Sequence, residues 1–488
     1  MAGNTGGTRV PDATVEHAVV LGASMAGLAA AAALAARARR VTVVERDPLP
    51  TSGEGADDAP RRGVPQGTHV HFLLPGGVAA LDVLLPGMTD DLWAAGAQLL
   101  DGRGDHRMLA GGGRVLLDGL DPAWILVAAT RPLIERVVRD RVVALDNVRL
   151  RDATRVLGLE TANGGRDIRG VRVTRGEGEE AEVLVADLVV DAMGRASRTP
   201  RWLEDLGYGS PPVQRLNVDA RYTTRFFHRG GEVPEDRLGV MIATLPGTHR
   251  QGGALVVQGE RWMVSLMGLA GDQAPTDLDG FRAYARSLWA PDIYDLVSTA
   301  EPLGDAVTGG FPANVRHRYD LMRRFPDGLA VLGDALCATN PHFARGMNVA
   351  AREAVALRGV LERHGRRRVG PRFFRSTRAL TNASWTFVTN NDLLQPDIDG
   401  ARTVGWRLVT GYSRRVTRAS HRDPVVARAF MDVFGVRSPP TRLLRPGIVL
   451  RTLLALRRAR PTTRAGDAIR HEHAQPAGVT TSEADRTH

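Results

Sequence analysis

The chain has 488 residues, 43% of them hydrophobic, and a formal net charge of +10 at pH 7. This length allows two or three packed units, and the apolar content is that of a globular protein. No apolar run is long enough to cross a bilayer, and the single cysteine, Cys337, excludes an internal disulfide framework. These features together predict a protein of the reducing cytoplasm.

The basic residues are all arginine, since the sequence contains no lysine. They occur along the whole chain and aromatic residues make up only 5%, so no stacking platform for nucleic acid is expected. The stretch RTLLALRRAR at 451–460 has the composition of a basic amphipathic helix at a membrane surface. A C-terminal helix packed on its own domain is the preferred interpretation of this stretch.

The first motif in chain order joins an apolar strand, residues 18–21, to an alanine-rich helix at 28–36. Between them, Gly22, Ser24 and Gly27 fit the pattern G-x-S-x-x-G. This is the dinucleotide fingerprint with serine in place of the middle glycine. Small residues there let the strand turn sharply and let a pyrophosphate approach the N–H groups at the helix start.

The next strand, residues 41–44, ends in an acidic residue, Glu45, which lies eighteen residues after Gly27. An acid at this place accepts hydrogen bonds from an adenosine ribose. Strand, glycine turn, helix, strand and acid in this order predict a Rossmann βαβ unit that binds a dinucleotide. An ordinary βαβ crossover without a nucleotide is the alternative.

Two distant stretches belong with this unit. The first is LVVDAMGRASRTPRWLEDLG, in which a strand ends at Asp191. The second is LAVLGDALCATNPHFARGMNVAAREA, in which a strand is followed by Gly333-Asp334, then by Pro341, and then by a helix that begins at residues 346–348. The three motifs in this order resemble the class A flavoprotein monooxygenases, the family of the aromatic hydroxylases and squalene epoxidase. The resemblance implies noncovalent FAD, with the Asp334 carboxylate on the ribityl chain and the turn after Pro341 on the flavin pyrimidine edge.

Further residues match the same family. Arg131, in ATRPLIERVV, matches an arginine that approaches the adenosine-side phosphates. The stretch RRGVPQGTHVHFLLPGG at 61–77 is similar to the bacterial polyether-antibiotic epoxidases of the lasalocid and monensin type, in which this loop lies over the flavin. The similarity covers residues 17–360. Arg345 departs from it, since it replaces a small or polar residue beside the flavin. His69 and His71 have no third ligand nearby in the sequence, so a metal site is not predicted.

The predicted cofactor-binding residues follow from these motifs: Gly22, Ser24, Ala26, Gly27, Glu45, Arg46, Arg131, Asp191, Gly333, Asp334, Pro341, Gly346, Met347 and Asn348. No catalytic residue is assigned. The candidates beside the flavin are Arg61, Gln66, His69, His71 and Arg345.

The predicted fold class is α/β, with a Rossmann-type FAD-binding domain, an antiparallel-sheet substrate domain and a C-terminal helical region. The FAD-binding domain covers 17–211 and returns at 313–360, the substrate sheet covers 212–312, and C-terminal helices cover 361–460. The two ends, 1–16 and 461–488, are polar and are predicted to be a disordered leader and tail.

The family resemblance implies an FAD-dependent monooxygenase of bacterial secondary metabolism, such as antibiotic biosynthesis. One oxygen atom of O₂ would pass through a flavin C4a-hydroperoxide to an alkene of a polyketide or isoprenoid-like substrate. The glycines at 111–113 lack the strand and helix of a second fingerprint, so NAD(P)H docks transiently or a partner flavin reductase supplies electrons. The alternatives are an aromatic-ring hydroxylase, a flavin dehydrogenase and a non-redox flavin protein. A halogenase is disfavoured, because it would use a catalytic lysine.

Overall fold

The computed structural model describes residues 14–49, 60–102, 104–176, 180–230 and 237–457. The predicted disordered tail, 461–488, lies outside these residues, and so does most of the predicted leader. The leader prediction extends too far, because the first strand already begins at Val15.

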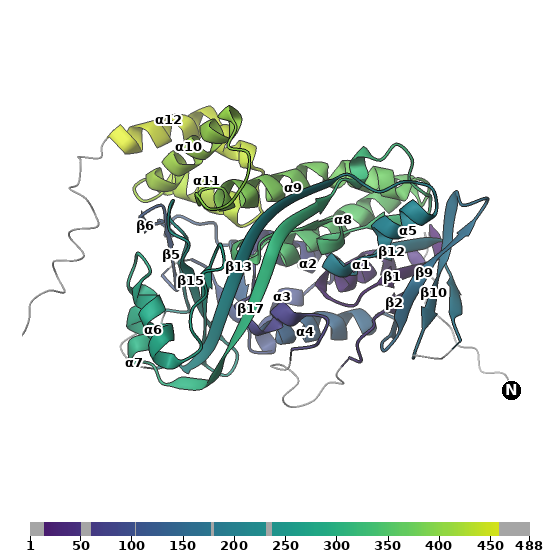
Figure 1. Cartoon of the computed structure of the whole chain (residues 1–488), viewed down its shortest axis with the longest axis horizontal. Coiled ribbons are helices and arrows are strands. Elements are labelled where there is room, and N and C mark those ends of the chain that lie inside the picture. Colours follow the sequence, from purple (N-terminus) through teal and green to yellow (C-terminus); the bar gives the residue numbers. More distant parts are fainter. Residues whose placement is uncertain (1–13, 50–59, 103, 177–179, 231–236, 458–488) are drawn as a thin grey trace, which may run out of the picture.

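Five parallel strands form the centre of the nucleotide-binding part, at the right in Figure 1. Leu21 at the end of the first strand pairs with Val44 on one side and Asp191 on the other, so three predicted motifs meet at one sheet edge. These strands are short, apolar runs because they lie in the main core, where the helix Met25–Ala35 and the strand Asp167–Thr174 both pack against the sheet. In spatial order they are β18 (Leu329–Val331), β12 (Leu188–Asp191), β1 (Val15–Leu21), β2 (Ala38–Val44) and β8 (Val148–Arg151).

The helix after the first strand is buried on almost every side. Its alanines allow close packing against the first two strands and against three other helices, and Ala26 is its one residue that is not fully buried. The helices of this part are α1 (Met25–Ala35), α2 (Pro75–Leu84), α3 (Met88–Ala94), α4 (Arg131–Val143), α5 (Thr199–Asp205), α8 (Gly346–His364) and α9 (Val369–Asp392).

The substrate part is built on an eight-stranded sheet that is wider than the predicted range 212–312. β5 joins it in parallel to β14, and β19 joins at the other edge, so residues from both flanking ranges complete it. In order, its strands are β19 (Cys337–Ala338), β17 (Pro302–His317), β13 (Val213–His228), β16 (Arg261–Gly268), β15 (Gln251–Val257), β14 (Gly239–Ile242), β5 (His106–Ala110) and β6 (Gly113–Arg114).

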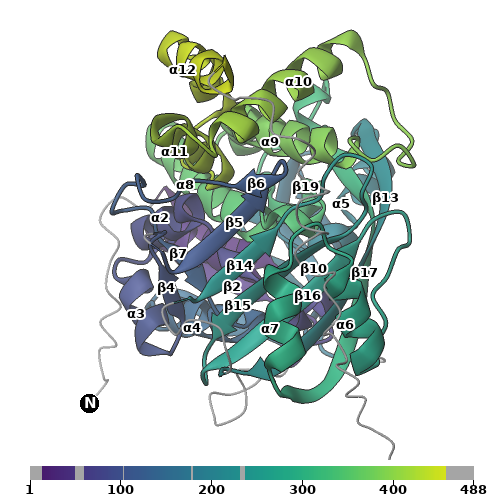
Figure 2. The ribbon, with the colours of Figure 1, turned by 90° about the vertical axis from the view of Figure 1, so that its left-hand side faces the viewer.

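Side chains alternate across this sheet, as the period of two requires. Val264 and Leu266 pack under α6 (Leu278–Arg286) and α7 (Asp292–Thr299), which cover the outer face (Figure 2). Their neighbours Ser265 and Met267 face the opposite side and line a cavity. One face of the sheet is therefore a core and the other is the wall of the site.

Smaller elements complete the fold. A hairpin-like sheet extends the nucleotide-binding part, a second small sheet lies near α2, and three helices form the C-terminal region at the upper left of Figure 1. These elements are β9 (Arg155–Ala162), β10 (Asp167–Thr174) and β11 (Glu182–Val185), then β3 (Phe72–Leu73), β7 (Leu126–Ala128) and β4 (Gln98–Leu100), and finally α10 (Val404–Ala419), α11 (Pro424–Phe434) and α12 (Pro446–Arg457). Among the described residues, none of the helices combines the length and apolar character of a membrane span.

Candidate functional site

A cavity of about 1310 Å³ lies between the two parts of the molecule. One end is lined by the turn between β1 and α1, and the other end by the inner face of the eight-stranded sheet. A pocket for one small ligand commonly has about 300–1,000 Å³. The cavity therefore has room for a large cofactor and a substrate together.

The glycine turn forms one end of the cavity. Gly22 has a φ of +100°, and a Cβ atom there would lie 2.8 Å from the carbonyl oxygen of Ala192, so only glycine fits. Ser24 begins α1, and its hydroxyl is not used to cap the helix. The start of α1 is thus open toward the cavity, which is the arrangement that binds a phosphate.

Glu45 lies beside this turn at the end of β2. Its Oε2 atom accepts a hydrogen bond of 2.8 Å from the N–H of Ala23 and forms a 3.1 Å ion pair with Arg61. The Arg61 Nε atom is 2.5 Å from Glu135, and its Nη2 atom is buried without a hydrogen-bond partner. These carboxylates raise the pKa of Arg61 against the effect of burial.

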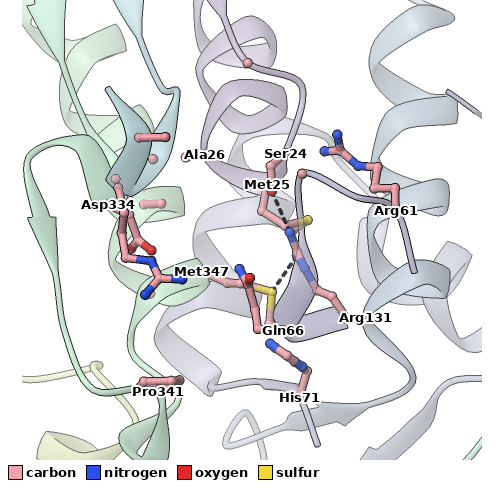
Figure 3. A pocket seen from close by; sticks show the side chains of 18 of the residues that line it. Ser24, Met25, Ala26, Arg61, Gln66, His71, Arg131, Asp334, Pro341 and Met347 are labelled. Carbon is pink, nitrogen blue, oxygen red and sulfur yellow. Dashed lines mark hydrogen bonds between the residues drawn. The ribbon is translucent and has the colours of Figure 1, made fainter. Parts of the chain in front are cut away.

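Arg131 extends from the first turn of α4 across the cavity, as the dashed lines in Figure 3 show. Its guanidinium donates to the Ser24 hydroxyl over 2.7 Å and to the sulfur of Met347 over 2.9 Å. Glu135 pairs with it at 2.7 Å. A buried cation that bridges the starts of α1 and α8 is placed to meet the phosphates of a bound nucleotide.

The Gly333–Asp334 turn follows β18 and forms the opposite wall, where Asp334 faces the cavity (Figure 3). Burial raises the pKa of Asp334, although Arg195 and Arg131 oppose this. Behind the turn, the N–H of Gly333 donates over 2.8 Å to Glu353 of α8. Glu353 is fully buried, and burial raises its pKa to about 8.

The substrate end contains a chain of hydrogen bonds. The Nδ1 atom of His69 is 2.8 Å from the hydroxyl of Thr224, which is 2.5 Å from the hydroxyl of Ser265. Ser265 also accepts from the N–H of Val70 over 3.0 Å. Burial lowers the pKa of His69 to about 4, so the imidazole is neutral at pH 7.

Two further polar rings, those of Tyr222 and His342, line the cavity near His69. Tyr222 stacks on it with ring centroids 5.2 Å apart, and His342 meets Tyr222 edge-on at 5.1 Å. The Nε2 atom of His69, the hydroxyl of Tyr222 and the Nε2 atom of His342 are all buried and lack a hydrogen-bond partner among the described residues. Three such atoms on one cavity wall form a polar patch that a bound molecule would satisfy.

The Pro341 turn is fixed from behind by a buried network. Asp392 accepts hydrogen bonds from the side-chain amides of Asn314 (2.7 Å) and Asn340 (2.9 Å). The backbone N–H of Asn340 donates to Asn314 over 2.6 Å. Burial raises the pKa of Asp392 to about 7, and the two amide donors act against it.

Most of the predicted residues come together in this cavity. It is lined by Gly22, Ser24, Ala26, Glu45, Arg46, Arg131, Gly333, Asp334, Pro341, Gly346 and Met347, and by all five candidates beside the flavin, Arg61, Gln66, His69, His71 and Arg345. His71 donates from Nδ1 to the carbonyl oxygen of His69 over 2.7 Å, and burial together with the Arg131 charge lowers its pKa to about 3. No cluster of three potential metal ligands occurs in the described part of the chain.

Three predicted cofactor residues do not line the cavity. A Cβ atom at Gly27 would lie 1.8 Å from the carbonyl oxygen of Gly22, so this glycine serves the contact between helix and turn. The carboxylate of Asp191 accepts from the N–H of Met193 over 2.9 Å and from the hydroxyl of Ser197. Asn348 bonds the backbone of Leu74 and Ala344. Each of the three residues contacts the backbone of a neighbouring segment and stabilises the cavity wall without lining it.

Arg345 lines the cavity, and its guanidinium also contacts residues of the C-terminal helices. Its guanidinium stacks over Phe387 of α9 at 3.9 Å and donates to the carbonyl oxygen of Val433 over 3.3 Å. Burial lowers its pKa to about 9. Its side chain therefore connects the turn before α8 to the C-terminal helices.

The sequence motifs did not identify the site residues that lie on the eight-stranded sheet. Thr224 and Tyr222 of β13 and Ser265 of β16 belong to no local pattern, because strands far apart in sequence bring them together. His342 is adjacent to a recognised motif, and its position directly after Pro341 is the one signal that points to it.

These residues fit FAD. Gly22 has the left-handed backbone that the turn requires, and this turn and the starts of α1 and α8 line the same cavity. Glu45 lies at the end of the second strand, where this fold places a ribose, and the Nη2 atom of Arg61 beside it has an unused hydrogen-bond donor. Asp334 and the Pro341 turn stand at the far end, toward the substrate sheet.

The comparisons with known proteins agree with this geometry. No family model matches the chain. Protein Rv3254 of Mycobacterium tuberculosis is 31% identical over 443 residues, which cover 86% of this chain and 90% of that protein.

Solved structures show the same fold at low identity. A flavoprotein/dehydrogenase from Cytophaga hutchinsonii has a TM-score of 0.62 at 17% identity and covers 91% of this chain and 98% of its own. PqsL, described as a probable FAD-dependent monooxygenase from Pseudomonas aeruginosa, has a TM-score of 0.57 at 18% identity. The match covers 86% of this chain and 100% of PqsL. CmlS, a flavin-dependent halogenase, has a TM-score of 0.59 at 16% identity, and the match covers 86% of this chain and 76% of CmlS. The chain thus belongs to the family of protein Rv3254, and its fold is that of the FAD-dependent monooxygenases and halogenases.

Proposed function

We propose that the chain is an FAD-dependent monooxygenase that transfers one oxygen atom of O₂ to a small organic substrate. The observation that carries this proposal is one cavity lined both by the FAD-fitting turns and by the inner face of the eight-stranded sheet. FAD, once bound and reduced, supplies the chemistry that activates O₂. The residues of the chain hold this group, orient the substrate beside it and keep water away from both.

The reaction we propose is epoxidation of an alkene in a polyketide or isoprenoid-like molecule. Met241, Met267 and Phe311 give the substrate end an apolar wall, which suits a substrate with no proton to remove. The stretch at 61–77, similar to the polyether epoxidases, supplies Gln66 and His71 to the same cavity. Halogenation is disfavoured, because the chain has no lysine to carry an activated halogen.

Aromatic-ring hydroxylation is a second candidate, and a specific observation favours it. The unpaired polar atoms of His69, Tyr222 and His342 would bind a phenol oxygen. The hydroxyls of Thr224 and Ser265 hold the Nδ1 atom of His69, which leaves Nε2 as the ring atom that would take the phenol proton. A base that removes the phenol proton raises the nucleophilicity of the ring, so this polar patch has a use in hydroxylation that it lacks in epoxidation.

A single-turnover experiment separates the candidates without the native reductant. NAD(P)H and a partner reductase remain proposed electron sources, so the holoprotein is reduced with dithionite under nitrogen instead. It is then mixed with air-saturated buffer that contains geraniol as the alkene or 1-naphthol as the phenol. Products are identified by mass, and hydrogen peroxide is measured as the uncoupled product.

Epoxidation predicts a geraniol product that is heavier by one oxygen atom, with unchanged yield in Thr224→Val. Hydroxylation predicts an oxygenated naphthol whose yield falls in Thr224→Val, because the His69 imidazole loses its partner. Thr248→Val, at a hydroxyl that bonds only within its own loop, is the matched control. Quantitative peroxide release with both compounds, in a protein that holds FAD, would count against oxygen transfer to either class.

A further inference from the structure

The positive charge of the chain is concentrated in the C-terminal helices. Arginines occur throughout the sequence, whereas acidic residues are scarce in the segment that forms these helices. Residues 401–457 contain twelve arginines, two aspartates and no glutamate, which gives this segment a formal charge of +10. The whole chain also has +10, so the remainder is close to neutral. The basic character is therefore a local property of one region, which has the field needed to attract an anionic partner.

The same region exposes large apolar side chains. Five of the seven exposed leucines among the described residues lie between 408 and 454. In α12, Leu450, Leu453 and Leu454 follow the spacing i, i+3, i+4 and are 43–58% exposed. Thr452 and Ala455 on the opposite face are buried against the neighbouring helices. α12 is thus packed on one side, and it presents a stripe of leucines on the other.

α10 repeats this combination. Val404 and Leu408, near its first turn, are 70% and 69% exposed. Its second half carries Arg414, Arg415 and Arg418, which are exposed. Eight of the twelve arginines form no ion pair with any residue that the structure describes: Arg402, Arg407, Arg414, Arg415, Arg418, Arg422, Arg445 and Arg457. Unpaired cations beside exposed leucines are typical of helices that lie in a lipid interface.

α10 and α12 lie at one end of the molecule. They are at its upper edge in both views, with no other element beyond them (Figures 1 and 2). We propose that this end of the molecule docks on an anionic lipid surface, with the leucines of α12 in the headgroup boundary and the arginines on acidic lipid headgroups. α12 packs on α10 and α11, as the preferred interpretation of this stretch predicted, and its outer face carries the exposed leucines.

An anionic lipid surface explains both the arginines and the exposed leucines, whereas each of the other kinds of partner explains only one of them. A nucleic acid would use the arginines but would gain nothing from exposed leucines. A second copy of the chain would cover the leucines but would bring a second charge of +10 against the first. Only a surface that is apolar inside and anionic outside satisfies the leucines and the arginines together.

Vesicle sedimentation of the full-length holoprotein tests this proposal. The vesicles contain either pure phosphatidylcholine or phosphatidylcholine with 30% phosphatidylglycerol, at low and at high salt. We expect binding to the anionic vesicles that weakens at high salt, because exposed charges are screened. The triple variant Leu450→Ser, Leu453→Ser, Leu454→Ser should bind at least tenfold more weakly.

The matched controls are exposed residues of the same kind elsewhere. The pair Val183→Ser and Val185→Ser, on the exposed β11, should leave binding unchanged. Arg414→Gln with Arg415→Gln should weaken binding about tenfold, and Arg201→Gln with Arg323→Gln should not. Retained FAD content shows that each variant is folded.

Three results would overturn the proposal. The first is equal sedimentation with and without phosphatidylglycerol. The second is tight binding to double-stranded DNA that the leucine triple variant leaves intact. The third is a dimer in size-exclusion chromatography that this variant dissociates, with no binding to vesicles.

Discussion

The pH dependence of stability should identify the buried carboxyl group of Glu353. Burial raises its pKa from the ordinary 4.5 to about 8 in the folded protein. A carboxyl group with a raised pKa contributes its full stability below pH 4.5 and loses it as the pH rises toward 8, because only the unfolded chain releases the proton in this interval. Each pH unit is worth about 1.4 kcal/mol, so the interval is worth about 5 kcal/mol at most.

Glu353→Gln removes this dependence. The amide is neutral at every pH and keeps an oxygen to accept the hydrogen bond from the N–H of Gly333. The variant should match the parent protein near pH 5 and become progressively more stable relative to it up to pH 8. Glu353→Ala should be less stable at pH 5 by about 1–3 kcal/mol, because it leaves the N–H of Gly333 unsatisfied.

Urea denaturation of both proteins, followed by far-ultraviolet circular dichroism at pH 5, 6, 7 and 8, measures these differences. Thr299→Ser, at an exposed hydroxyl of α7 that bonds only its own helix, provides the control for handling and pH. The reasoning is refuted if the difference between Glu353→Gln and the parent protein stays constant from pH 5 to pH 8.

Three other substitutions have outcomes that the structure sets. Gly27→Ala should prevent folding or FAD retention, since its Cβ would lie 1.8 Å from the carbonyl oxygen of Gly22; a stable, yellow variant in an absorbance scan would contradict this. Asp334→Ala should weaken FAD binding about 2- to 10-fold in a fluorescence titration, through the loss of one hydrogen bond, whereas the exposed Asp205→Ala should not. Asp392→Asn should lower the urea midpoint by the equivalent of about 1–3 kcal/mol, because its amide would face two amide donors; an unchanged midpoint would show that the network is dispensable.

The local motifs predicted most of the residues that line one end of the cavity. A strand, a glycine turn and a helix are adjacent in sequence, so the pattern of residues alone places Gly22 and Glu45 at one end of the parallel sheet. Gly27 and Asp191 lie within these motifs but do not line the cavity, and they hold the turns beside it instead. A motif gives the order of residues along the chain, and it does not give the direction of each side chain.

The substrate end could not be predicted in this way. His69, Thr224 and Ser265 form one hydrogen-bonded chain, yet His69 precedes Thr224 by 155 residues and Ser265 by 196 residues in the sequence. Their contact depends on the pairing of β13 with β16, and alternation alone does not determine which strands pair. Net charge was also misleading, because its total conceals the concentration of arginine and the lack of acid in residues 401–457.

Isotope labelling tests the proposed oxygen transfer most directly. The dithionite-reduced holoprotein is mixed with ¹⁸O₂ and whichever of the two substrates it oxidises, and the product mass is compared with a reaction in H₂¹⁸O under ordinary oxygen. The account predicts one ¹⁸O atom per product from ¹⁸O₂ and none from water. A product that has lost two hydrogen atoms and gained no oxygen would contradict it and would show a flavin dehydrogenase instead.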